Sequence, residues 1–278
     1  DIVMATDPDS DRLGVYCKDE KNGGYISFNG NMSGMLIAEY IFRERQKAGT
    51  LPANGALVST IVTTNMARAV AEHYGAVNIE TLTGFKYIGE QIKLFEETGR
   101  YEYVFGLEES YGCLVGTHAR DKDAVAAVAA LAEIAAYCKC TGSTMWDEML
   151  KVYEKFGCYR EELRTITMKG MEGLAMINAL MEKLRNDPPK IIGGLKVLKV
   201  RDYKKDEIRD CATGEITPTG LRRSNVLYFE LENDSWCCAR PSGTEPKIKF
   251  YMGVKKDSIK EADEALKQIS EAVMALAE

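Results

Sequence analysis

The stretch ALVSTIV at residues 56–62 is an apolar run without a charged side chain, which is typical of a strand buried on both faces of a sheet. The residues after it alternate between helical periodicity and further apolar runs. The expected elements are strands at 77–82 and 103–107, and helices at 65–75, 86–99 and from 123 onward. Strand and helix in strict alternation predict an α/β/α domain with a mostly parallel sheet.

Before and after this alternating stretch, the order of predicted strands and helices is different. A helix at 34–47 leads into it, and residues 1–31 read as three strands with no helix, too little for a domain. After a helix near 145–155 come one helix, several strands able to pair antiparallel and a last helix at 258–277, typical of an α+β domain. We therefore expect three segments: the end of an earlier domain at 1–31, an α/β/α domain at 32–155 and a smaller α+β domain at 156–278.

The composition argues against several classes of function. The chain has 278 residues, 45% hydrophobic and 28% charged, with a net charge of −6 and no basic cluster, so a nucleic-acid partner is not expected. No apolar run approaches the roughly 18 residues of a spanning helix, so no membrane partner is expected. Eight cysteines without a CxxC pair, and only two histidines, favour reduced thiols over zinc or disulfides. We expect a cytoplasmic protein.

The loop DPDSDR at residues 7–12 carries three carboxylates at alternate positions, Asp7, Asp9 and Asp11. Carboxylate oxygens are the ligands that Mg²⁺ and Ca²⁺ prefer, and three so close together repel unless a cation neutralises them. An EF-hand needs Gly at the sixth loop position, where this chain has Arg12. A solvated acidic turn remains the alternative, but it gives Arg12 no role. The spacing favours a divalent cation.

Two further loops follow predicted strands at the edge where ligands bind in such sheets. Thr83, Gly84 and Lys86 lead from a strand into a helix, whose start favours anions. Glu108 and Ser110 follow the next strand, and their side chains can hold adjacent sugar hydroxyls through hydrogen bonds. The competing interpretation of the second loop is a plain helix start with acidic residues near its N-terminus.

A basic segment, HARDKD at residues 118–123, comes after the second of these loops. His118 on its own is more often a packing or surface residue than a catalytic one, and Lys122 is more often solvated than buried. Both are reagents only if a substrate reaches them.

The loop RPSGTEPK at residues 240–247 lies between two predicted strands of the last domain. The guanidinium fork of Arg240, the hydroxyls of Ser242 and Thr244 and the backbone N–H of Gly243 are groups that bind a phosphate dianion. A plain hairpin turn is the alternative. The chain contains no GxxxxGK[ST], GxGxxG or GxSxG motif, which argues against a P-loop enzyme, a dinucleotide enzyme and an α/β-hydrolase.

In this order, the DPDSDR, TGFKYIG, GLEESYG and RPSGTEPK segments resemble the phosphoglucomutase/phosphomannomutase superfamily. The resemblance implies a three-layer α/β/α domain with a mixed, mostly parallel sheet, followed by a small α+β domain. It implies an isomerase, an intramolecular phosphotransferase of a small phosphosugar, with glucose 1,6-bisphosphate as intermediate and a phosphoserine in N-terminal domains that this sequence lacks. Because the chain opens on an apolar strand, we expect it to begin in mid-domain.

The resemblance also assigns roles to the residues of these loops. It implies that the three aspartates ligate Mg²⁺ and that Arg12 offsets charge on the transferring phosphoryl group. The candidate general base is Lys122, with His118 second. The implied substrate-binding residues are Thr83, Gly84, Lys86, Glu108 and Ser110 for the sugar, and Arg240, Ser242, Gly243 and Thr244 for the phosphate that does not react.

The sugar itself is left open by the sequence. The EESYG form of the loop at 108–112 looks more like glucose-preferring members, which favours interconversion of glucose 1-phosphate and glucose 6-phosphate. A phosphomannomutase or phosphopentomutase of the same family is the alternative, and a non-catalytic sugar-phosphate-binding module is another. Because no phosphoserine segment is present, we expect residues 1–278 alone to lack mutase activity.

Overall fold

The computed structural model describes residues 1–168, 170–243 and 245–276. The chain forms two compact units, Asp1–Phe156 and a second unit that begins at Gly157. Each unit has its own sheets and buried residues, and each is described separately.

Unit 1 begins with a three-stranded antiparallel sheet in the order β1-β2-β3. Its strands are β1 (Ile2–Thr6), β2 (Leu13–Lys18) and β3 (Tyr25–Phe28). The register pairs Thr6 with Leu13, so the acidic segment 7–12 is the loop that closes the first hairpin. The predicted three strands without a helix are therefore present.

The second sheet of unit 1 has the order β5-β4-β6-β7. Its strands are β4 (Gly55–Thr60), β5 (Val77–Thr81), β6 (Glu102–Glu108) and β7 (Gly112–Val115). Strand β4 is parallel to both β5 and β6, whereas β7 is antiparallel to β6. The three parallel strands therefore end at one edge, where the loops after Thr60, Thr81 and Glu108 meet.

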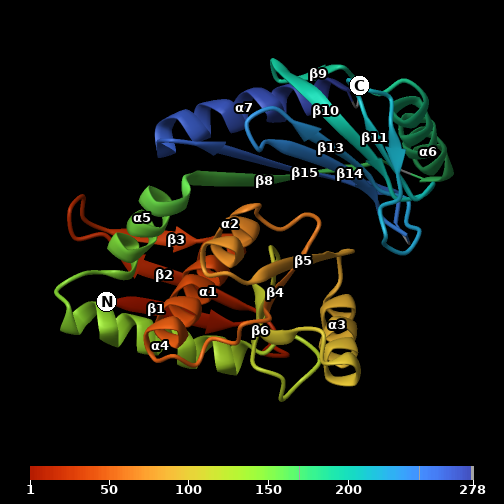
Figure 1. Ribbon diagram of the computed structural model, residues 1–278. Helices are drawn as coiled ribbons and strands as arrows, with labels where there is room; N and C mark the ends of the chain where they lie inside the picture. The colour runs from red at the N-terminus through yellow and green to blue at the C-terminus, as the bar shows by residue number, and fades with distance from the viewer. Residues whose placement is uncertain (169, 244, 277–278) are drawn as a thin grey trace. The chain divides into compact units, whose positions relative to one another are not determined.

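Helices cover both faces of this sheet (Figure 1). The helices of unit 1 are α1 (Gly30–Lys47), α2 (Met66–His73), α3 (Phe85–Thr98), α4 (Ala124–Cys140) and α5 (Met145–Phe156). A Cβ on Gly34 of α1 would meet Leu107 Cδ1 at 2.6 Å, and a Cβ on Gly106 would meet Ile88 of α3 at 2.9 Å. Since neighbouring residues of a strand point to opposite faces, α1 and α3 lie on opposite sides. The predicted α/β/α layering with a mixed, mostly parallel sheet is confirmed.

The structure corrects one predicted boundary in unit 1 and excludes one competing interpretation. Helix α1 begins at Gly30 rather than at 34, because the side chain of Asn29 caps it by accepting a hydrogen bond from Met32 N at 2.8 Å. The competing helix start after Glu108 does not form either, since β6 turns back into β7. Tyr111, at φ 69°, takes the left-handed conformation that this tight connection requires.

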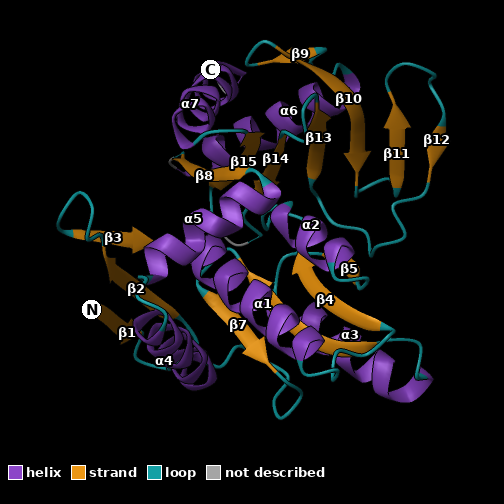
Figure 2. Cartoon of the chain, turned by 60° about the vertical axis from the view of Figure 1, so that its left-hand side comes forward, coloured by secondary structure: helices purple, strands orange, loops and turns teal. Residues whose placement is uncertain are grey.

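Unit 2 is built on one antiparallel sheet, with the strand order β12-β11-β10-β13-β14-β15-β8 and β9 paired to β10 (Figure 2). The strands expected to pair antiparallel are represented by β10 (Leu195–Asp202), β13 (Leu227–Leu231), β14 (Trp236–Pro241) and β15 (Lys247–Lys256). The other elements are β8 (Cys158–Thr167), α6 (Gly170–Asn186), β9 (Ile191–Ile192), β11 (Glu207–Asp210), β12 (Ile216–Thr217) and α7 (Ile259–Leu276). Antiparallel pairing with two long helices is the α+β arrangement expected.

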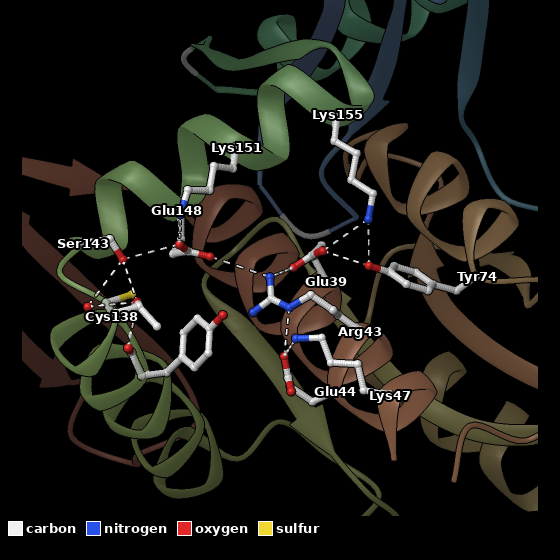
Figure 3. A network of polar contacts seen from close by, with 12 residues as sticks. Glu39, Arg43, Glu44, Lys47, Tyr74, Cys138, Ser143, Glu148, Lys151 and Lys155 are labelled. Atoms are coloured by element: carbon white, nitrogen blue, oxygen red, sulfur yellow. Dashed lines mark hydrogen bonds and ion pairs between the residues drawn. The ribbon is translucent and has the colours of Figure 1, made fainter. Parts of the chain in front are cut away.

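A network of charged side chains joins the helices of unit 1 (Figure 3). Arg43 of α1 pairs with Glu39 of the same helix at 2.7 Å and with Glu148 of α5 at 3.6 Å. Lys155 of α5 donates to the hydroxyl of Tyr74 at 2.8 Å, and that hydroxyl donates to Glu39 at 2.8 Å. Glu39 and Glu148 are only 3% and 5% exposed, so these partners replace the water that both carboxylates lose.

In the part of the chain that the structure describes, no single helix has the length and apolar character needed to cross a membrane. Helices α4 and α5 meet that test only when taken together, and a bend of 93° separates them. All eight cysteines fall among the described residues, and all of them are free thiols, six of them buried.

Candidate active site

The acidic loop forms a cluster of oxygen ligands. One carboxylate oxygen from each of Asp7, Asp9 and Asp11 lies within 4.8 Å of the others. Asp7 Oδ1 accepts hydrogen bonds from the backbone N–H groups of Asp11 and Arg12, both at 3.1 Å. Burial works against ionisation of Asp7, but these hydrogen bonds outweigh it and hold the pKa of its carboxyl below the usual value. These hydrogen bonds therefore favour the ionised form of Asp7.

Asp11 gives the strongest sign that the cluster can hold a cation. Its Oδ1 is buried and, among the described residues, has no hydrogen-bond partner. The Nε of Arg12 lies 3.7 Å from that oxygen, beyond hydrogen-bond distance. A buried carboxylate oxygen without a hydrogen bond is costly, and a bound cation would remove that cost. The residues present fit a divalent metal ion such as Mg²⁺.

Lys122 reaches the same cluster from the loop before α4. Its Nζ lies 2.8 Å from Asp11 Oδ2 and 2.9 Å from Asp121 Oδ1. Partial burial lowers the pKa of Lys122, but the hydrogen bonds to Asp11 and Asp121 outweigh this and raise it above the ordinary value. The predicted catalytic lysine is therefore a protonated neighbour of the acidic loop.

The two loops at the carboxyl edge of the sheet also meet. Gly84, at φ 125°, has a conformation that only glycine adopts easily, and its N–H donates to Glu108 Oε1 at 2.8 Å. Thr83 Oγ1, beside it, is buried and has no hydrogen-bond partner among the described residues. An unpaired hydroxyl next to a buried carboxylate is the arrangement expected where a polar ligand belongs.

Glu108 is 5% exposed, and this burial raises the pKa of its carboxyl. The hydrogen bond from Gly84 and the positive charges of Lys122 and Arg12 work in the opposite direction but do not cancel the effect. Ser110 lies half-buried in the turn after β6, and Lys86 is exposed in the first turn of α3 with its Nζ 4.9 Å from the centre of the Tyr87 ring.

Backbone hydrogen bonds join the loop at residues 108–112, which carries Glu108 and Ser110, to the acidic loop at residues 7–12. Leu13 N donates to the carbonyl of Tyr111 at 3.1 Å, and Ala124 N donates to the carbonyl of Ser10 at 3.1 Å. Gly30 packs so closely on this turn that a Cβ there would meet the Glu109 carbonyl oxygen at 2.2 Å. The three predicted loops of unit 1 are therefore held as one constellation.

The predicted phosphate loop lies in unit 2, at the end of the β14–β15 hairpin. Arg240 is half-buried on β14 and its NH1 lies 3.4 Å from the Tyr251 hydroxyl. Ser242 N donates to the Lys247 carbonyl at 2.8 Å, which closes the turn. A Cβ on Gly243 would meet no atom within 4 Å, so packing does not require glycine there. Thr244 lies outside the described residues.

The sequence was compared with those of known protein families and proteins. Residues 29–156 match the phosphoglucomutase/phosphomannomutase α/β/α domain III. Over 255 residues, 92% of this chain, the sequence is 34% identical to the phosphoglucomutase of Staphylococcus aureus. Residues 29–156 belong to this domain family, and the chain as a whole resembles the C-terminal portion of a phosphohexomutase.

Solved phosphohexomutases share the fold. The parafusin phosphoglucomutase of Paramecium, in an open form, matches 99% of this chain and 45% of its own with a TM-score of 0.69 at 19% identity. An Aspergillus fumigatus N-acetylphosphoglucosamine mutase variant in complex with glucose 1,6-bisphosphate matches 100% of this chain and 49% of its own, with a TM-score of 0.50 at 15% identity. The chain spans about half the length of the curated relatives it matches, 45% for the S. aureus enzyme.

Some residues of this candidate site were not predicted from the sequence. Asp121 pairs with Lys122 in addition to Asp11, and Asp123 caps α4 through Val125 N and Ala126 N. His118 Nε2 lies 2.7 Å from Asp123 Oδ2, and this contact lowers the pKa of Asp123. His118 is therefore engaged with the helix cap. The alternating charges of residues 121–123 are the signal that could have identified both aspartates.

Proposed function

We propose that this chain supplies the metal, sugar and phosphate loops of a phosphohexomutase that interconverts glucose 1-phosphate and glucose 6-phosphate. The observation that carries the proposal is the convergence of Asp11, Thr83, Glu108 and Lys122 from four separate segments of unit 1. Two of these residues have buried oxygens that lack a hydrogen bond within the described part of the chain. A sugar hydroxyl and a cation would satisfy them.

Each group has a chemical task in this proposal. Glu108 accepts hydrogen bonds from sugar hydroxyls, and Ser110 and Thr83 add hydroxyls that both donate and accept. Because a mutase must bind its sugar in two orientations, such a set has to recognise hydroxyls common to both. In unit 2, Arg240, Ser242 and Gly243 are proposed to hold the phosphate that does not react, with Thr244 beside them.

The reacting phosphoryl group would be served by the acidic loop and its neighbours. Asp7, Asp9 and Asp11 would hold Mg²⁺, which supplies positive charge to a transferring phosphoryl group. Arg12 adds a second positive charge. Lys122 is the proposed acceptor of the proton from the attacking hydroxyl, and it can take that proton only after giving up its own. His118, engaged with Asp123, is the weaker candidate.

A whole phosphohexomutase also needs a phosphoryl donor, and a phosphoserine in a further domain of the same protein is proposed for that role, with glucose 1,6-bisphosphate as intermediate. The relatives matched are about twice as long as this chain, which supports the presence of such a domain. The cytoplasm remains the proposed location.

The test is a coupled assay of the protein carrying this chain together with its upstream domains. We expect wild type to convert glucose 1-phosphate at limiting Mg²⁺ and Asp9→Asn to lose turnover by orders of magnitude while retaining its circular dichroism spectrum. Normal turnover of Asp9→Asn would mean that the acidic loop is a solvated turn. Parallel assays with mannose 1-phosphate and ribose 1-phosphate determine the sugar, and faster turnover of either would replace glucose in the proposal.

A further inference from the structure

The two carboxylate oxygens of Asp11 have different surroundings. Oδ1 is the buried atom without a hydrogen bond in the described chain, and it belongs to a residue of the three-aspartate cluster. Oδ2 is paired with Lys122 Nζ at 2.8 Å. One carboxylate therefore serves both the cluster and the lysine, and any cation bound by the cluster lies a few Å from a second positive charge.

Lys122 is held in this position by the fold around it. Its side chain is only 10% exposed. A Cβ on Gly112 would lie 2.1 Å from Lys122 Cδ, so the lysine stem fills the space that the glycine leaves. Its Nζ lies 5.6 Å from the centre of the Phe85 ring, in cation–π range. The lysine is a built part of the site, unlike a solvated side chain that happens to touch an acid.

We propose that Lys122 is the built-in counter-ion of the acidic loop and that it competes with the divalent cation for Asp11. This inference rests on the proposed function, because it assumes that the cluster binds a cation. Without the cation, Lys122 offsets the repulsion among the three carboxylates. With the cation bound, that repulsion is already neutralised and the two positive charges repel each other.

The competition has a consequence for the lysine. Coupling between two binding events is reciprocal. If Lys122 weakens binding of the cation, the bound cation weakens the Lys122–Asp11 ion pair by the same free energy. Cation binding therefore loosens Lys122 from Asp11, and its ammonium group then keeps the pairing with Asp121, whose side chain is 72% exposed. The metal would thus free the catalytic lysine as well as contribute its own charge.

A purely orienting lysine predicts the opposite result. If Lys122 acted only by aiming Asp11 at the cation, its removal would let the carboxylate turn away and the affinity for Mg²⁺ would fall. If it competes, its removal leaves an uncompensated cluster that binds Mg²⁺ more tightly. The sign of one measurement separates the two roles.

The measurement is a calorimetric titration of Mg²⁺ into the 1–278 chain and its variants. Lys122→Met keeps the apolar stem and removes the charge, and we expect it to bind Mg²⁺ about tenfold more tightly than wild type. Lys122→Gln serves as a second, polar replacement should the first fold poorly. Lys93→Met is the matched control, since Lys93 is 70% exposed and pairs only with Glu97 in the contacts described; it should bind like wild type.

The outcomes are distinct. Equal or weaker binding by both Lys122 variants would overturn the inference and leave the proposed metal loop intact. Absence of Mg²⁺ binding in every protein would contradict the metal loop itself, and the inference with it. As a second readout, acylation of Lys122 by an amine-reactive reagent, followed by mass spectrometry, should rise severalfold when Mg²⁺ is added, while Lys93 is unchanged. Labelling of Lys122 that is independent of Mg²⁺ would also overturn it.

Discussion

Glu108 shows how a single residue can be placed for a ligand at a cost to the fold. Its carboxylate is buried and, among the described residues, accepts one hydrogen bond, from Gly84, although a carboxylate can accept several. Burial therefore dominates and raises its pKa. Sugar hydroxyls would supply the missing donors, which makes the residue useful with its ligand and unfavourable without it.

The first prediction concerns the stability of a Glu108→Gln variant. Because the folded pKa is raised, the folded state binds the proton more tightly, and ionisation of Glu108 destabilises it as the pH rises from the unfolded pKa of 4.5 through the higher folded pKa. Glutamine does not ionise, and its carbonyl can still accept from Gly84. We expect the variant to have the higher melting temperature at pH 8 and the difference to vanish near pH 4. A lower melting temperature at pH 8 would contradict this.

The second prediction concerns Arg240. Its bonds to a phosphate would be charge-assisted and worth roughly 1.5–3 kcal/mol each, so Arg240→Ala should weaken binding of glucose 6-phosphate about 10- to 100-fold in a calorimetric titration. Arg240→Lys retains the charge but not the planar fork and should recover only part of that loss.

The control for this experiment is Arg209→Ala, which removes an exposed arginine of the same unit on strand β11. That variant should bind like wild type. Similar affinity in all four proteins would assign Arg240 a structural role through its contact with Tyr251.

At the level of residues, the sequence indicated which side chains belong to the candidate site better than it indicated which side chains they contact. Asp7, Asp9 and Asp11 could be selected because alternate carboxylates in a hairpin loop repel each other, and this repulsion is a local property. The pairing of Lys122 with Asp11 joins positions 111 residues apart, and no local pattern encodes it. The role of Asp123 at the start of α4 could have been read from its place before an alanine-rich helix.

Among the elements, α1 and α5 depend on charged contacts as well as on apolar packing. Arg43 lies between two nearly buried carboxylates, Glu39 and Glu148 (Figure 3). Two neighbouring helices are thus joined by ions that have lost most of their water. Removing one charged partner from such a network costs more stability than the network contributes when complete, because the remaining charges stay buried without a counter-ion.

The third prediction follows from this network. Arg43→Met should destabilise the packing of α5 by about 3 kcal/mol, since Glu39 and Glu148 would each lose a partner. Hydrogen exchange measured by mass spectrometry should then show faster exchange in peptides from 145–156, with no change in peptides from unit 2. Lys47→Met, which removes a 57% exposed lysine that pairs with Glu44, is the control and should change exchange little. Unchanged exchange in Arg43→Met would contradict the proposed importance of the network.

The strands that could be predicted from the sequence differ in length and burial from those that could not. The central residues of strands such as β4 and β6 form apolar runs because both faces of the sheet are covered, and this pattern is visible without a structure. Strand β7 has four residues and was not predicted, and β9 and β12 have only two each. Such short strands are defined by their partners rather than by their own periodicity.

For the whole molecule, the sequence and the comparisons lead to the same family by different routes. The sequence contains, in a fixed order, four loops whose side chains can bind a metal ion, a sugar and a phosphate. Independently, residues 29–156 match the family's domain III. Within unit 1, the fold then brings loops separated by more than 100 residues to one edge of a sheet. The division of residues 1–31 from 32–155 stays a proposal, since both segments belong to one compact unit.

The central claim is that the loops of this chain bind a phosphohexose through Glu108. The most direct test is a calorimetric titration of glucose 6-phosphate, with Mg²⁺ present, into wild type, Glu108→Gln and Glu97→Gln. Glu97 is 60% exposed and pairs with Lys93, so its variant controls for the loss of one negative charge. We predict saturable binding by wild type and Glu97→Gln, and binding at least about tenfold weaker for Glu108→Gln, since hydrogen bonds to a charged group are worth roughly 1.5–3 kcal/mol. Equal affinities in the three proteins, or no binding by wild type, would contradict the account.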